Sequence, residues 1–292
     1  MIQTDLKSYD TGVVNKVNRL ISLLSEIERH PVLSRRVCLH GGTAINLFMQ
    51  KAPRLSVDAD ITYIGNESKD IADIERPVIE NAIKEIGAYL CYNVTATKNA
   101  IAGRTFKLRY SGERGSDYIK IDINYLNQIP LLPLTYLECV LDNNVHITTL
   151  SREELIAGKA KALFDRVAMR DIYDISRLYH IIEEIFDLDN ETVAIKLHRT
   201  ILFYTALANL FPTDFIGLTK KRFSGNDRRV IDELYPMLNV ADRPTLTGMI
   251  ADAEAFVEQY VAPQNKDEIE YPQFPPPMRR GIRSLRECIH QR

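Results

Sequence analysis

One segment, Leu39–Thr62, limits the fold and the chemistry of this chain more than any other. A short apolar run ends at Gly41-Gly42, a helical pattern follows, and a β-like run then carries Asp58 and Asp60. Because successive side chains of a strand point to opposite faces, Asp58 and Asp60 share one face of that strand. Paired carboxylates repel each other unless a cation lies between them, so this pair indicates a Mg²⁺ site.

The glycine pair adds a second chemical feature. A glycine turn that leads into a helix N-terminus presents backbone N–H groups, which suit a phosphate. Together with the two carboxylates, the turn supplies the parts of a metal-dependent enzyme that acts on a nucleoside triphosphate. His40, directly before the glycines, is as consistent with a nucleotide contact as with a packed or capping role.

A third carboxylate lies on a later predicted strand. The run Tyr118–Tyr125 alternates strictly, which places Lys120, Asp122 and Asn124 on one face and isoleucines on the other. Antiparallel or mixed pairing with the 57–62 strand could bring Asp122 beside the first two carboxylates. The alternative is that each of these is an ordinary strand carboxylate facing solvent.

A helix is predicted to begin after Ser151, where Ser151 and Glu154 form the pattern of a capping box. Along it Arg166 and Arg170 lie seven and eleven residues after Lys159, which is close to whole helical turns, so the three lie roughly along one stripe. Asp171 and Asp174 continue this stripe if the helix does not break near Ala168. Without other context, such a stripe is usually a solvated face.

These blocks together resemble a known family. The order G-G, then D-x-D, then a later strand Asp is similar to the nucleotidyltransferase fold of DNA polymerase β, CCA-adding enzymes and antibiotic nucleotidyltransferases. The blocks G-G-T-A-I-N-L, R-L-S-V-D-A-D, I-K-I-D-I and K-A-K-A-L-F-D-R-V-A-M-R-D-I-Y-D-I closely resemble the AbiEii/AbiGii toxin family. Members of that family are nucleotidyltransferase toxins of type IV toxin–antitoxin and phage-abortive systems.

The resemblance implies an α/β (α+β) fold, in which a polymerase-β-like nucleotidyltransferase domain with a mixed sheet spans residues 1–150. A mostly helical domain would span residues 151–292, with the active site between the two. The expected reaction transfers a nucleoside monophosphate from a nucleoside triphosphate to an acceptor. The family suggests a tRNA 3′ end or another RNA as acceptor, which would block translation, and a cognate antitoxin protein as partner.

The resemblance also assigns roles to residues. One or two Mg²⁺ ions, for which Mn²⁺ could substitute, are expected on the three strand carboxylates, and the basic residues of the last block are expected to hold the triphosphate. The expected metal ligands are Asp58, Asp60 and Asp122. The expected catalytic residues are Asp58, Asp60, Asp122, Lys159 and Asp171, and the expected nucleotide-binding residues are Gly41, Gly42, Thr43, Lys159, Arg166, Arg170 and Asp174.

Composition fits one large or two modest domains of a cytoplasmic enzyme, since the 292 residues include 45% hydrophobic ones. No apolar run approaches the ~20 residues of a membrane span, and the N-terminus lacks a signal-peptide pattern. The four cysteines are scattered, which favours neither a zinc site nor a disulfide framework. The net charge of −2 gives no general nucleic-acid signature. Basic clusters at 159–170, 220–229 and 279–292 could track phosphates or could be solvated helix faces.

Three alternatives remain open at this point. An antibiotic-modifying nucleotidyltransferase would use the same carboxylates with a small pocket, and a protein-modifying one would act on a hydroxyl of its partner. A catalytically inactive nucleotide-binding module would keep the fold without turnover.

The periodicity predicts helices at about 13–29, 70–90, 151–166, 171–186, 190–209, 227–238, 246–261 and 278–290, and strands at 37–39, 57–62, 91–97, 104–110 and 118–125.

Overall fold

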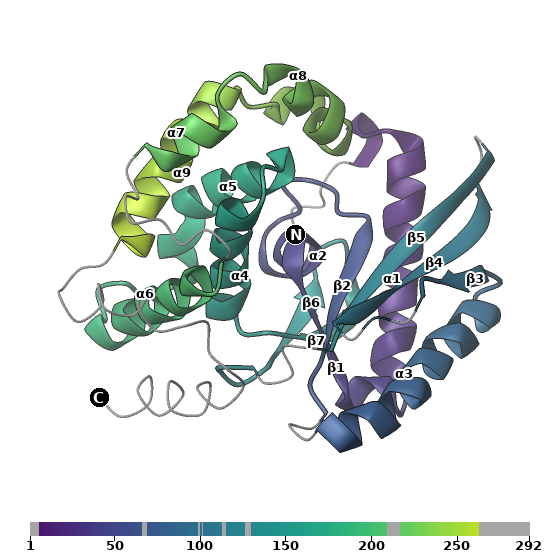
Figure 1. Cartoon of the computed structure of the whole chain (residues 1–292). Helices are drawn as coiled ribbons and strands as arrows, with labels where there is room; N and C mark the ends of the chain where they lie inside the picture. The colour runs from purple at the N-terminus through teal and green to yellow at the C-terminus, as the bar shows by residue number, and fades with distance from the viewer. Residues whose placement is uncertain are drawn as a thin grey trace. The chain divides into compact units, whose positions relative to one another are not determined.

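The computed structural model describes residues 6–65, 69–98, 100, 102–112, 115–125, 130–208 and 217–262. The chain divides into two compact units (Figure 1). The first comprises Met1–Arg152 with Pro236–Asp242, and the second comprises Glu153–Tyr235 with Arg243–Arg292. In the described part of the chain, the first unit contains every strand and the second is helical.

The first unit is built on a mixed sheet whose described strands have the order β3-β4-β5-β2-β1-β7-β6. The pairs β1–β7 and β2–β5 are parallel, and the remaining neighbours are antiparallel. The strands are β1 (Val37–His40), β2 (Asp58–Tyr63), β3 (Asn93–Ala96), β4 (Gly103–Gly112), β5 (Gly115–Asn124), β6 (Thr135–Cys139) and β7 (Asp142–Thr149).

Two long helices, α1 (Thr11–Arg29) and α3 (Lys69–Tyr89), pack on one face of this sheet. Asp10 caps α1, because its carboxylate accepts the N–H groups of Gly12 at 2.8 Å and Val13 at 3.2 Å. The strands present apolar side chains to this face, among them the buried Leu108 and Ile121. Short elements complete the unit: 3₁₀ turns at Leu6–Ser8, Leu33–Arg35 and Val240–Asp242, and α2 (Gly41–Ala44) continued by a π turn at Ile45–Met49.

A late segment of the chain returns to the first unit. The residues Pro236–Asp242 belong to it, and the backbone N–H of Leu55 donates to the carbonyl of Met237 at 2.9 Å. The bond fixes the stretch that leads into β2, three residues before Asp58. A sequence-based division at residue 150 does not anticipate this return.

The second unit consists of helices joined by short turns. They are α4 (Arg152–Asp165), α5 (Met169–Ile185), α6 (Glu191–Ala206), α7 (Leu218–Phe223), α8 (Asp227–Arg229) with a π turn at Val230–Leu234, and α9 (Leu246–Phe256) with a π turn at Val257–Val261. A 3₁₀ turn at Tyr235–Met237 begins in this unit and ends in the returning segment of the first. α5 packs on α9, where the Ser176 hydroxyl donates to the carboxylate of Asp252 at 2.5 Å.

The predicted fold class is confirmed: a mixed sheet with helices is followed by a helical part. The predicted elements up to residue 125 are present, with ends shifted by one to three residues. The periodicity missed β6 and β7, and the helix predicted at 227–238 is a series of short turns. The predicted helix 278–290 and the C-terminal basic cluster lie outside the described residues.

Among the residues that the structure describes, no helix combines the length and the apolar character that crossing a membrane requires.

Candidate active site

The three strand carboxylates share one face of the sheet. Parallel pairing of β2 with β5 places Asp60 opposite Asp122 and Asp58 opposite Lys120. Directly paired residues project to the same face, so Asp58, Asp60 and Asp122 are neighbours there. The alternate residue Ala59 is buried on the other face. The predicted proximity of Asp122 to the D-x-D pair is confirmed, whereas the expected antiparallel pairing is wrong, because β2 and β5 pair in parallel.

A row of polar side chains crosses four strands at the level of Asp60. The register pairs His40 of β1 with Asp60, Asp60 with Asp122 of β5, and Asp122 with Thr105 of β4. The Thr105 hydroxyl donates to the Asp122 carboxylate at 2.6 Å. These four residues, with Arg104 among others, line a cavity of about 350 Å³. This volume lies within the range of about 300–1,000 Å³ found for small-molecule sites.

Gly41 adopts a conformation that only glycine accepts easily. Its φ of +71° lies in the left-handed region, and a Cβ there would lie 2.4 Å from Oδ2 of Asp60. The turn therefore passes directly over the second carboxylate of the D-x-D pair. At Gly42 a Cβ would lie 2.7 Å from Nη2 of Arg54, so a side chain there would require that guanidinium to shift.

Thr43 connects this turn to β2. Its hydroxyl donates to the backbone carbonyl of Asp58 and lies 2.8 Å from Oγ of Ser56. The side chain is buried, with 1% of its surface exposed. These contacts give Thr43 a role in holding the turn against β2, and its predicted contact with a nucleotide stays a prediction.

The Asp122 carboxylate also forms an ion pair with Lys120, two residues earlier on β5. Partial burial would lower the pKa of Lys120, but Asp122, Asp58 and Asp60 together raise it above its ordinary value. The raised pKa of Lys120 therefore reflects the negative potential of this face.

In the described part of the chain, no three His, Cys, Asp or Glu side chains are close enough to share one ion. The donor chemistry of carboxylate oxygens on one face nevertheless fits Mg²⁺.

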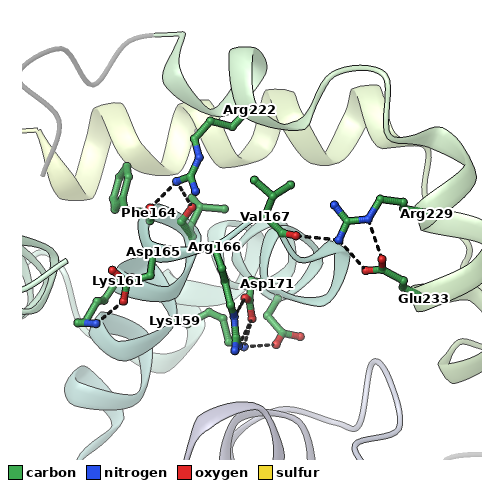
Figure 2. A network of polar contacts seen from close by, with 12 residues as sticks. Lys159, Lys161, Phe164, Asp165, Arg166, Val167, Asp171, Arg222, Arg229 and Glu233 are labelled. Atoms are coloured by element: carbon green, nitrogen blue, oxygen red, sulfur yellow. Dashed lines mark hydrogen bonds and ion pairs between the residues drawn. The ribbon is translucent and has the colours of Figure 1, made fainter. Parts of the chain in front are cut away.

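The second unit contains a cluster of four charged residues, three of them buried, and Figure 2 labels Lys159, Arg166 and Asp171. The Lys159 ammonium lies 2.9 Å from Asp171 and 2.8 Å from Asp174, and all three side chains are at most 5% exposed. Arg166 Nε lies 2.6 Å from the same Asp171 carboxylate, while 66% of the Arg166 side chain is exposed. Arg166 is thus the member of the cluster that solvent reaches.

The cations of this cluster control the charge of Asp171. Burial alone would raise the pKa of this carboxyl, but Lys159 and Arg166 hold it well below its usual range. A buried carboxylate in this setting orients its two cationic partners. The predicted catalytic roles of Lys159 and Asp171 stay predictions.

The prediction of a continuous basic stripe along one helix is wrong. α4 ends at Asp165 and α5 begins at Met169, after Ala168 in an extended conformation. The guanidinium of Arg222 donates to the carbonyls of Leu163 at 2.9 Å and Phe164 at 2.5 Å. These bonds satisfy carbonyl groups that the end of α4 leaves without helical partners, which stabilises the break. The half-buried Arg170 lies on α5, after the break.

Two arginines of the basic cluster at 220–229 have structural roles. Arg229 donates to the Val167 carbonyl at 2.8 Å and pairs with Glu233 at 2.7 Å, and Arg228 lies 3.7 Å from Asp232 (Figure 2 shows the first two). Arg222 is also bound to carbonyls, whereas Lys220, Lys221 and Arg228 are exposed, so the phosphate-tracking surface that the sequence allowed stays a prediction. Lys107 and Arg109 of β4, which the sequence reading did not single out, lie on the carboxylate face and are considered below.

Solved structures with the same fold include two from bacteria. JHP933 from Helicobacter pylori is 17% identical, with 86% of this chain and 92% of that chain covered and a TM-score of 0.54. MenT4, a nucleotidyltransferase toxin from Mycobacterium tuberculosis, is 14% identical, with 95% and 93% covered and a TM-score of 0.58. At these identities the likeness shows the fold alone. On this fold the glycine turn lies beside the carboxylates of β2 and β5.

The chain belongs to the AbiEii family, since the family model described as "Nucleotidyl transferase AbiEii toxin, Type IV TA system" matches residues 22–258. It is therefore a nucleotidyltransferase of the toxin–antitoxin class. Membership implies a nucleoside triphosphate substrate and a cognate antitoxin. No curated protein matches the chain.

Proposed function

We propose that this toxin transfers a nucleoside monophosphate to the 3′ end of tRNA or of another RNA in the cytoplasm, which blocks translation. The observation that carries the proposal is the parallel register of β2 and β5. It places Asp58, Asp60 and Asp122 on one open face, beside a cavity that takes a small molecule. Such a carboxylate face suits transfer to a hydroxyl group.

The reaction needs a base at the acceptor hydroxyl. The hydroxyl oxygen attacks the α-phosphorus, the bond from that phosphorus to the bridging oxygen breaks, and pyrophosphate leaves. Asp122 is suited to accept the hydroxyl proton, because Thr105 and Lys120 hold its carboxylate at the cavity wall.

Asp58 and Asp60, with Asp122, would hold the Mg²⁺ expected of this chemistry. When bound, Mg²⁺ supplies positive charge to the phosphate oxygens and favours ionisation of the attacking hydroxyl. Gly41 keeps the turn close to Asp60 and so fixes the direction of that carboxylate.

Arg166 is proposed to contact the triphosphate. Its guanidinium is largely exposed, while its Nε is held by the buried Asp171. Lys159 and Asp174 complete the charge balance around that carboxylate. The cluster thus presents one oriented guanidinium, which suits phosphate oxygens.

The experiment is a labelling assay with each of the four α-labelled nucleoside triphosphates, Mg²⁺, and either purified tRNA, total RNA or total protein. We expect label on RNA, lost in Asp60→Asn protein and on addition of EDTA. Exclusive labelling of protein, or of an added aminoglycoside, would replace the RNA acceptor by one of the alternative acceptors. A wild-type protein that labels nothing would refute the proposed transfer.

A further inference from the structure

Polar and aromatic side chains continue the carboxylate face along β4 and β5. The register pairs Lys107 with Lys120 next to the Asp122–Thr105 row, and Arg109 with Tyr118 one row further. Because alternate residues share a face, these rows lie on the same face as Asp122. Figure 1 shows β4 and β5 as the long paired strands of the sheet.

Lys107 and Arg109 differ from the cations beside them. Within the described residues, neither Lys107 nor Arg109 has a carboxylate within ion-pair distance, whereas Lys120 pairs with Asp122 and Lys16 with Asp117 at 3.1 Å. Arg109 is exposed and Lys107 half-buried. Among the described residues, no acid therefore forms an ion pair that compensates their positive charge.

The ring of Tyr118 gathers these cations. Nζ of Lys107 lies 4.9 Å from its centroid, the guanidinium carbon of Arg109 5.8 Å, and Nζ of Lys16 5.0 Å. Cation–π attraction holds the charges close together without neutralising them. Lys107 and Arg109, which no described acid pairs with, thus lie beside an aromatic ring, and this combination binds single-stranded nucleic acid, since the cations bind phosphates and the ring stacks on a base.

The distances along the strand fit a chain of nucleotides. Two residues of a strand span about 7 Å, so the Lys107 row lies about 7 Å and the Arg109 row about 13 Å from Asp122. A small acceptor in the cavity beside Asp122 would not reach the second row. An extended polynucleotide whose terminal hydroxyl lies at Asp122 would pass over both rows.

We infer that the face formed by Lys107, Arg109 and Tyr118 binds the single-stranded 3′ end of the acceptor RNA. Lys107 and Arg109 bind successive phosphates, and Tyr118 stacks on a base. This inference rests on the proposed function, because it takes the acceptor hydroxyl to lie at Asp122. By this inference, side chains of β4 and β5 select an unpaired polynucleotide as acceptor in preference to a small molecule or a duplex.

The test measures binding separately from transfer. The full chain, carrying Asp60→Asn to prevent turnover, is titrated into a fluorescent single-stranded RNA ending in a free 3′-hydroxyl, and anisotropy is recorded at several salt concentrations. We expect Lys107→Ala with Arg109→Ala to weaken binding at least about tenfold. The slope of log K against log salt should become shallower by about 1.4, because each phosphate contact to a single strand contributes about 0.7.

A matched control removes one lysine and one arginine elsewhere. Arg29→Ala with Lys84→Ala changes the net charge equally, and both side chains are exposed on α1 and α3. This control should change affinity and salt slope little. Tyr118→Ala should weaken binding about fivefold or more, while Tyr118→Phe should retain it.

Equal affinities of the Lys107/Arg109 variant and the control would overturn the inference. So would equal binding of a blunt RNA duplex and the single strand. Failure of the proposed function has a different signature, because wild-type protein would then bind the single strand through this face yet transfer no label to it.

Discussion

Replacing Gly41 by alanine tests whether the glycine turn sets the position of Asp60. The new Cβ would lie 2.4 Å from Oδ2 of Asp60, whereas real contacts essentially never fall below 3.0 Å, so the carboxylate must shift by about 0.6 Å or more. The left-handed backbone adds strain of about 1–2 kcal/mol. Misplacement of a catalytic group by about 1 Å can reduce the rate about a hundredfold, so we expect a loss of tenfold to a hundredfold.

The assay compares initial rates of label transfer and melting temperatures with those of a control that has the same strain. Gly217 has a φ of +76°, and nothing lies within 4 Å of the position of its Cβ. Gly217→Ala should therefore lower the melting temperature through backbone strain alone, yet keep its transfer rate. If both variants had the same transfer rate, the reasoning about Asp60 would be refuted.

Lys159→Ala leaves the buried Asp171 and Asp174 without their ammonium partner, so we expect the free energy of unfolding in urea to fall by about 3–5 kcal/mol; an unchanged value would contradict the buried ion pairs. The exposed Arg166 should behave differently: Arg166→Ala should keep most of the stability while the Kd for a non-hydrolysable triphosphate, measured by calorimetry, rises about tenfold, and an unchanged Kd would remove Arg166 from the phosphate site. Because folding lowers the pKa of Asp171 below its unfolded value of about 3.9, its contribution to stability is present above that pH and lost as pH falls below about 4. Asp171→Asn should therefore flatten the acid side of the stability–pH curve, and a curve of unchanged slope would count against the lowered pKa. Expression of the wild-type protein should arrest bacterial growth and Asp122→Asn should relieve the arrest at matched protein levels; equal arrest by both would exclude toxicity through transfer.

The parts of the site that follow from local periodicity could be predicted from the sequence. The alternation around Asp58, Asp60 and Asp122 fixes which side chains share a face, because the strand repeat is two residues. The same alternation leaves the direction of pairing open, since parallel and antiparallel strands can show the same pattern. The register of Asp60 with Asp122 depends on the whole sheet and required the structure.

Long-range contacts account for what the sequence did not reveal. The break between α4 and α5 depends on Arg222, whose donors reach carbonyls almost sixty residues earlier in the chain. Offsets along one segment cannot report such a partner, so Lys159 was expected on an open stripe. Lys107 and Arg109 were overlooked because alternating cations on a strand suggest a solvated face until the carboxylate row beside them is known.

The bond between Leu55 and Met237 has a consequence for the time at which the toxin is completed during synthesis. The chain that enters β2 is made about 180 residues before the segment that fixes it. At roughly 5–20 residues per second, that interval lasts about 10–35 s. All three strand carboxylates are therefore synthesised well before Met237 can anchor the stretch that leads into the first of them. A ribosome that stalls after Asp122 and before Met237 holds a chain with every expected metal ligand but without that anchor.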